Sequence, residues 1–142
     1  MLNGVKIAPS ILSADFSSLG KEIIKLDKSQ CDYIHIDIMD GHFVPNITIG
    51  PDVVKSLRKY TKKLFDVHLM IDPVKKYIPE FINAGSDIIT IHQEISENVM
   101  DCINIIKKNN VKAGLCVKPK TSVKSIEKYL DYIDLVLIMT VE

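Results

Sequence analysis

The sequence of 142 residues has no excess of charge of either sign and no long apolar run. Lysine and arginine together number 18, as do aspartate and glutamate, so the net charge is zero. Nucleic-acid binding needs a basic stripe or patch, so we expect no nucleic-acid partner. No segment reaches the roughly 18 continuous apolar residues of a membrane helix, so we expect no membrane partner either.

Cysteines are few, and their spacing suggests no pairing. Cys31, Cys102 and Cys116 form neither an even set nor a Cys-x-x-Cys pair, which predicts reduced, buried thiols in a cytoplasmic protein. The opening stretch MLNGVKIAPS enters strand-like sequence at once and leaves no room for the regions of a signal peptide. With 46% hydrophobic residues, the composition is typical of a soluble globular domain.

The sequence alternates regularly between β-rich runs and segments with helical periodicity. The runs that read as strands lie at 5–10, 33–39, 64–70, 87–92, 112–117 and 134–140. Between them, apolar residues recur at the spacing of one helical face, as at Leu19, Ile23 and Leu26. This alternation with short links predicts a parallel sheet with right-handed crossovers.

Several residues mark where helices and turns are expected. The expected helix starts are Ser17 or Ser18, Ser96, and Thr121 or Ser122. Gly85 is expected to end a helix and Pro79 to lie in the first turn of one. Asp32, Asp87 and Asp134 each precede a run of aliphatic residues, which predicts turn residues rather than catalytic ones.

Two architectures fit the alternation: an open doubly wound sheet and a (β/α)8 TIM barrel. Central strands of an open sheet are apolar on both faces, whereas 33–39 and 64–70 carry His, Asp and Met along one face. That pattern favours the inside of a barrel near its mouth. A full barrel needs about 200–250 residues. We therefore expect residues 1–142 to form a single domain, incomplete at its C-terminus, that covers about the first six strands and five helices.

The most informative residues lie on two neighbouring predicted strands. His35 and Asp37 alternate with isoleucines in YIHIDIM, and Asp66, His68 and Met70 alternate with apolar residues in FDVHLM. Side chains two apart on a strand are rooted roughly 6.5–7 Å apart on one face, so two donors can lean onto one ion. Two histidines and a carboxylate at the ends of neighbouring strands favour a divalent metal bound by His35, Asp37 and His68.

Further residues fall at the same strand ends, each with two interpretations. His92 is either an additional ligand or second donor, or a satisfied core residue. The side chains of three methionines, Met39, Met70 and Met139, either pack in the hydrophobic core or form an apolar ring that excludes water from a reacting centre. Ser10 either hydrogen-bonds a polar ligand or caps a turn.

A metal beside a carboxylate suggests a reaction class. The ion can hold the oxygens of an α-hydroxyketone and stabilise an enediolate while Asp37 removes or returns the adjacent proton. Inversion of the stereocentre also needs a second acid on the opposite face, and the sequence offers no convincing residue for it.

These stretches resemble the ribulose-phosphate 3-epimerase family. The resemblance rests on APSILSADF at 8–16, HIDIMDGHFVPN at 35–46, DVHLM at 66–70 and the final LVLIMTVE, and extends over essentially the whole chain. It implies a (β/α)8 barrel that interconverts D-ribulose 5-phosphate and D-xylulose 5-phosphate in the pentose phosphate pathway. It also implies one divalent metal ion, Zn²⁺ or Fe²⁺, with Mn²⁺ or Co²⁺ as alternatives.

Individual roles follow from the resemblance by position. His35, Asp37 and His68 match metal ligands, and Asp37 also matches one of two acid/base aspartates. The residues that match substrate contacts are Ser10, His68, Met39, Met70 and Met139. The second catalytic aspartate and the phosphate-binding loops are expected beyond residue 142. The partner would be a small-molecule sugar phosphate, and the assembly a homo-oligomer, either dimer or hexamer.

Two alternatives stay open. An allulose-6-phosphate 3-epimerase would use the same residues on a hexulose phosphate, and turnover of the two substrates would distinguish the enzymes. A catalytically inactive truncated barrel is the second alternative, favoured only if the chain is naturally this short.

Overall fold

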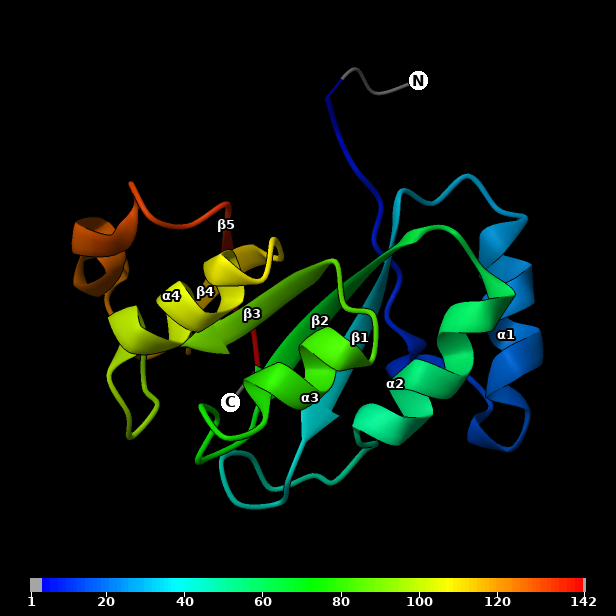
Figure 1. Ribbon diagram of the computed structural model, residues 1–142, viewed down its shortest axis with the longest axis horizontal. Helices are drawn as coiled ribbons and strands as arrows, with labels where there is room; N and C mark the ends of the chain where they lie inside the picture. The colour runs from blue at the N-terminus through cyan, green and yellow to red at the C-terminus, as the bar shows by residue number, and fades with distance from the viewer. Residues whose placement is uncertain (1–3, 142) are drawn as a thin grey trace.

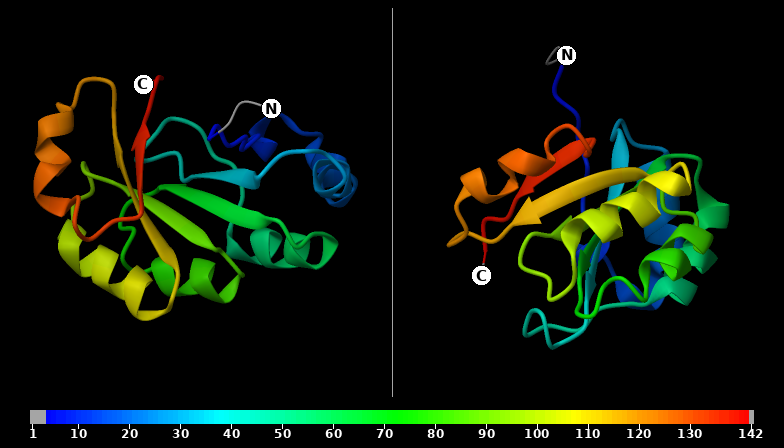
Figure 2. Two further views of the ribbon diagram at one scale, coloured as in Figure 1. Left: turned by 90° about the horizontal axis from the view of Figure 1, so that it is seen from above. Right: turned by 60° about the vertical axis from the view of Figure 1, so that its left-hand side comes forward.

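The computed structural model describes residues 4–141, which form a five-stranded parallel sheet in the order β1-β2-β3-β4-β5. The strands are β1 (Tyr33–Met39), β2 (Leu64–Met70), β3 (Ile88–His92), β4 (Lys112–Val117) and β5 (Leu135–Ile138). Helices lie along the outer side of the curved sheet (Figures 1 and 2). The arrangement is an arc of a (β/α) barrel, which confirms the predicted fold class.

Helical segments connect consecutive strands. The α-helices are α1 (Leu19–Asp27), α2 (Pro51–Leu57), α3 (Ile78–Asn83) and α4 (Val99–Lys108). The 3₁₀ helices are η1 (Ile11–Ser13), η2 (Phe16–Ser18), η3 (Arg58–Tyr60) and η4 (Val123–Tyr129). Gly85 follows α3 with a φ of 93°, a left-handed conformation that ends the helix without steric cost. Among residues 4–141, no helix is long and apolar enough to cross a membrane.

The hydrophobic core lies between the sheet and its outer layer of helices. In β1, Ile34, Ile36 and Ile38 are buried, whereas the residues that alternate with them are only half-buried and face inward. Every second side chain of a strand points to the same face, so the alternation in the sequence becomes a division between core and barrel interior. The three cysteines are free and buried, as predicted.

The first predicted strand, Val5–Ser10, is wrong in its secondary structure. This segment is extended beside β1, and the carbonyls of Ile7 and Pro9 accept N–H groups there, but only Ser10 forms an isolated bridge, to His35. Proline has no N–H, and the N–H of Ile7 binds the side chain of Asp32 instead of a β1 carbonyl. The donors of a regular ladder are therefore missing.

Two predicted helix starts also need correction. The side chain of Asn98, not that of Ser96, caps α4 by accepting the N–H of Asp101 at 3.1 Å. Ser122 does begin a helix, as predicted, but that helix is η4, which is 3₁₀ rather than α. Pro79 lies in the first turn of α3 as predicted.

The three predicted turn aspartates occupy equivalent places at the amino edge of the sheet. Each carboxylate accepts a backbone N–H from the preceding strand or extended segment and pairs with a basic side chain. The backbone donors are Ile7 for Asp32, Phe65 for Asp87 and Ala113 for Asp134, at 2.8–2.9 Å. The basic partners are Lys6, Arg58 and Lys107, in the same order. These contacts confirm a structural role for all three aspartates.

Candidate metal centre

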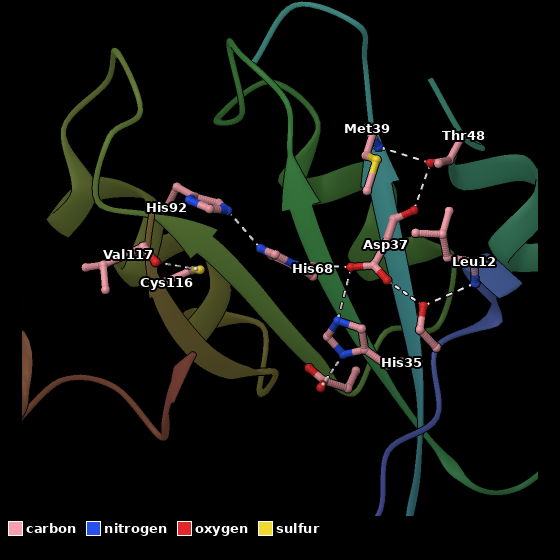
Figure 3. Close-up of polar contacts among 11 residues, drawn as sticks. Leu12, His35, Asp37, Met39, Thr48, His68, His92, Cys116 and Val117 are labelled. Atoms are coloured by element: carbon pink, nitrogen blue, oxygen red, sulfur yellow. Dashed lines mark hydrogen bonds and ion pairs between the residues drawn. The ribbon is translucent and has the colours of Figure 1, made fainter. Parts of the chain in front are cut away.

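The register of β1 and β2 places the polar residues of the two strands side by side. His35 is aligned with Asp66, Asp37 with His68, and Met39 with Met70. Since all of them project from the inner face, two imidazoles and two carboxylates meet near the carboxyl edge of the sheet (Figure 3).

The three predicted ligands converge as the sequence suggests. Donor atoms of His35, Asp37 and His68 all lie within 4.8 Å of one another. Both His35 Nε2 and His68 Nδ1 are 3.2 Å from Oδ1 of Asp37. Two imidazole nitrogens and a carboxylate oxygen form a donor set that divalent transition metals accept, with coordination positions left for other ligands.

Ser10 caps a turn, which is one of the two interpretations that the sequence left open, and it also contacts Asp37. Its hydroxyl donates to Oδ2 of Asp37 and also accepts the N–H of Leu12 at 3.1 Å, which caps η1. Thr48 holds the backbone of the same strand, because its hydroxyl donates to the Asp37 carbonyl at 2.7 Å. The carboxylate of Asp37 is thus fixed from several sides.

Asp66 is a site residue that the sequence analysis did not single out. Its Oδ2 lies 2.8 Å from Nδ1 of His35, while its Oδ1 is buried and has no hydrogen-bond partner. The available signal was the match between H-x-D-x-M and D-x-H-x-M, which places Asp66 beside His35 once the two strands are aligned. An acceptor at Nδ1 keeps a proton on that atom, so Nε2 of His35 is the nitrogen that can bind a cation beside Asp37 once it has lost its own proton.

The electrostatics of the pocket favour a positive charge. Burial alone lowers the pKa of His35, but its hydrogen bonds to Asp37 and Asp66 outweigh burial and raise the pKa to about 9. Burial raises the pKa of Asp37, yet hydrogen bonds from His35, His68 and Ser10 hold this pKa well below its ordinary value. A site that stabilises an imidazolium and an ionised carboxylate is suited to a metal cation.

His92 lies on the far side of His68 and does not join the group around Asp37. Its Nε2 is 2.8 Å from Nε2 of His68, and its Nδ1 is 3.2 Å from a carboxylate oxygen of Glu94. Burial and the neighbouring His68 lower the pKa of His92 to about 4. Donor atoms of His68, His92 and Cys116 form a second group within 4.8 Å. Glu94 was missed by the sequence analysis, although it follows His92 by two residues.

A cavity of about 230 Å³ opens above these side chains. Its lining contains all the predicted metal and substrate residues except Ser10. Ser10 contacts the site through its hydrogen bond to Oδ2 of Asp37. The lining residues are His35, Asp37, Met39, His68 and Met70, together with Leu12 and residues 137–141. Met139 therefore reaches the same cavity from the end of β5, as the sequence predicts.

The fold and these residues define an α/β barrel-type protein with a candidate metal centre at the carboxyl edge of its strands. Residues 6–142 match the model of the ribulose-phosphate 3 epimerase family. Ribulose-phosphate 3-epimerase of Bacillus subtilis is 53% identical over 96% of this chain, and that of Escherichia coli K12 is 48% identical over 95%. The chain belongs to the ribulose-phosphate 3-epimerase family.

The match leaves part of each relative uncovered. The chain spans 63% of the B. subtilis protein and 60% of the E. coli protein. It also spans 60% of the ribulose-phosphate 3-epimerase of Rhodobacter capsulatus, to which it is 45% identical.

Solved structures of more distant proteins share the fold. The tryptophan synthase alpha chain of Legionella pneumophila superimposes with a TM-score of 0.58 at 13% identity, over 87% of this chain and 55% of its own. A tryptophan synthase structure from M. tuberculosis superimposes with a TM-score of 0.61 at 12% identity, over 94% of this chain and 65% of its own.

Proposed function

We propose that the protein interconverts D-ribulose 5-phosphate and D-xylulose 5-phosphate by epimerisation at C3. The observation that carries this proposal is the convergence of His35, Asp37 and His68, whose donor atoms lie within 4.8 Å of one another. The convergence occurs in a chain that is 45–53% identical to three relatives named ribulose-phosphate 3-epimerase.

We propose that His35, Asp37 and His68 hold one divalent metal ion, with Zn²⁺ or Fe²⁺ favoured over Mn²⁺ or Co²⁺. Nitrogen and oxygen donors in this mixture suit all four metals, and the preference for the first two rests on the family resemblance. A divalent ion at this place would polarise the carbonyl and hydroxyl oxygens of the substrate and offset the negative charge of an enediolate.

Asp37 is proposed to remove and return the proton at C3. Its carboxylate is ionised, because its hydrogen bonds lower its pKa, and it can therefore accept a proton. The hydroxyl of Ser10 holds Oδ2 of Asp37, so the carboxylate keeps one orientation toward the cavity.

The methionines are proposed to shield the reacting atoms from water. Met70 is almost fully buried, and Met39 and Met139 are half-buried on the cavity wall. Apolar thioethers around the substrate exclude water and so strengthen the electrostatic interactions within the cavity.

The wider setting follows from the same proposal. The substrate is a small-molecule sugar phosphate, the pathway is the pentose phosphate pathway, and the location is the cytoplasm. We further propose that residues 1–142 belong to one barrel domain and that the protein assembles as a dimer or hexamer of identical chains.

The test uses the protein at its natural length, with elemental analysis followed by exchange of the substrate C3 hydrogen in heavy water. Asp37→Asn should lower the exchange rate by about 10²–10⁴-fold while the protein stays folded. Asp131→Asn removes the same charge from an exposed turn and serves as the control. Exchange at the wild-type rate in Asp37→Asn would remove Asp37 from the reaction. Faster turnover of a hexulose phosphate than of a pentulose phosphate would instead favour an allulose-6-phosphate 3-epimerase.

A further inference from the structure

A continuous row of hydrogen-bonding groups leads from the candidate metal centre across the inner face of the sheet. Oδ1 of Asp37 faces Nδ1 of His68 at 3.2 Å, and Nε2 of His68 faces Nε2 of His92 at 2.8 Å. Nδ1 of His92 then faces Oε2 of Glu94 at 3.2 Å. We call His68, His92 and Glu94 the histidine relay; Figure 3 shows His68 between Asp37 and His92.

The two rings of the relay are dry and closely packed. His68 is 3% exposed and His92 is fully buried, and their rings stack with centroids 4.9 Å apart. The edge of Phe43 packs on His92 at 4.8 Å, and Lys118 lies over the Phe43 ring and donates to its carbonyl. Bulk water therefore has little access to the ring nitrogens, so each must be satisfied by its neighbour in the row.

Counting protons along the row assigns one tautomer to each neutral ring. The carboxylate of Glu94 is an acceptor that also receives the N–H of Lys118 at 2.8 Å, so Nδ1 of His92 must carry a proton. Nε2 of His92 then has only a lone pair and must accept, and Nε2 of His68 must donate. Nδ1 of a neutral His68 is left as a lone pair that faces a carboxylate oxygen. In the charged ring a proton on Nδ1 bridges this 3.2 Å contact, and when that proton is lost a divalent cation can take its place between the two acceptors.

We propose that Glu94 and His92 are positioning residues for the metal centre. Glu94, acting through His92, keeps His68 in the tautomer whose Nδ1 is free to bind a divalent cation together with Asp37. Asp66 has the same effect on His35 by direct contact, so each metal-binding imidazole is supported by its own carboxylate. This inference rests on the proposed metal site and extends it to two residues outside the cavity.

The second group of donors, His68, His92 and Cys116, is a weaker candidate for the ion. Two nitrogens bound tetrahedrally to one zinc ion lie about 3.3 Å apart. The Nε2 atoms of His68 and His92 are 2.8 Å apart, which is a hydrogen-bonding distance.

The first experiment measures Co²⁺ affinity by chelator competition in the natural-length protein, and so does not depend on catalysis. Glu94→Gln and His92→Phe should each raise the dissociation constant by about 10–100-fold. In Glu94→Gln the side-chain amide can donate to Nδ1 of His92, which moves the proton of His92 to Nε2 and the proton of His68 to Nδ1. In His92→Phe the acceptor for Nε2 of His68 is lost. His92→Gln keeps an acceptor and should recover part of the affinity. Glu80→Gln, on the exposed surface of α3, is the matched control and should bind as the wild type does.

The second experiment reads the tautomers directly from the ¹⁵N chemical shifts of the histidine rings in metal-free protein. Wild-type His92 should be protonated at Nδ1 and not at Nε2, and Glu94→Gln should lose this preference. A proton on Nε2 of wild-type His92, or Co²⁺ affinity within about twofold of wild type in Glu94→Gln, would overturn the relay. These measurements remain decisive if His92→Phe fails to fold, because Glu94 is only half-buried.

Two outcomes separate the relay from the other proposals. Lack of Co²⁺ binding by the wild type would overturn the proposed metal centre. The ¹⁵N shifts of His92 would then still show whether Glu94 fixes the tautomer of that ring. An intense cobalt–thiolate band that disappears in Cys116→Ser would place the ion on the second group and overturn the relay.

Discussion

The two edges of the sheet use aspartate in different ways. At the amino edge, Asp32, Asp87 and Asp134 each accept a backbone N–H and pair with a lysine or arginine. On the inner face of β1 and β2, which leads to the carboxyl edge, Asp37 and Asp66 make their ion-pair contacts with imidazoles instead. The side chain is the same, and its partners differ.

The partners decide what each aspartate can do. The lysine and arginine partners at the amino edge stay charged at all relevant pH values. Their contacts with aspartate therefore do not depend on titration of the basic group. An imidazolium can release a proton to water and then bind a metal ion through the freed nitrogen, and the side chains of Asp37 and Asp66 are only 13% and 7% exposed. The amino edge is thus built for stability and the carboxyl edge for chemistry, as in other barrels.

The amino-edge contacts recur at every second strand junction. They join the 5–10 segment to β1, β2 to β3, and β4 to β5. Lys63 and Val111 stand immediately before β2 and β4, where the other junctions carry aspartate. A repeat of two strands therefore underlies the recurrence of an aspartate before a run of aliphatic residues.

Replacing Asp66, the acceptor for Nδ1 of His35, should affect metal binding most. In Asp66→Asn the side-chain amide can donate to Nδ1 of His35, which moves the proton of that ring to Nε2, the atom that faces Asp37. We expect Co²⁺ affinity to fall by about 10–100-fold, measured by competition with a chelator, with a much smaller change in stability. Affinity equal to that of the wild type would show that Asp66 does not orient His35.

The opposite result is expected at the amino edge. Asp87→Ala leaves the N–H of fully buried Phe65 without its acceptor and removes a partner of Arg58. We expect the free energy of unfolding to fall by about 1–3 kcal/mol, measured by urea denaturation, with Co²⁺ affinity unchanged. Asp131→Ala, in an exposed turn, is the control. A loss of metal affinity in Asp87→Ala as large as in Asp66→Asn would remove the distinction between the edges.

The smallest effect concerns the pH dependence of one amino-edge contact. Burial raises the pKa of Asp134, but hydrogen bonds from Lys107 and the N–H of Ala113 outweigh burial and lower this pKa. A lowered folded-state pKa adds stability above the ordinary aspartate value of about 3.9, and this stability is lost as pH falls through the folded value. The stability difference between wild type and Asp134→Asn should therefore be constant from about pH 7 to 5 and shrink toward pH 3 in urea titrations. A difference that grows on acidification would contradict this assignment.

Much of the fold and of the candidate site could be predicted from local sequence patterns. The bounds of β1, β2 and β4 match the predicted runs, and β3 begins one residue later than expected. Alternation with period two is a property of the strand itself, so the shared face of His35 and Asp37 needed no tertiary information. The absence of a strand at 5–10 was not predictable in the same way, since it depends on where the side chain of Asp32 binds.

The sequence by itself determined the parallel α/β architecture, the inward face of each strand and the three donors of the candidate metal centre, because these follow from spacing along the chain. Only the tertiary structure decided that Asp66 meets His35 and that Glu94 reaches His68 through His92. Those contacts depend on the register between strands, which is set by the packing of helices and loops whose lengths differ. Hydrogen-bond partners on separate strands have no fixed separation in sequence, and so the partners of the two candidate metal-binding histidines are a property of the fold.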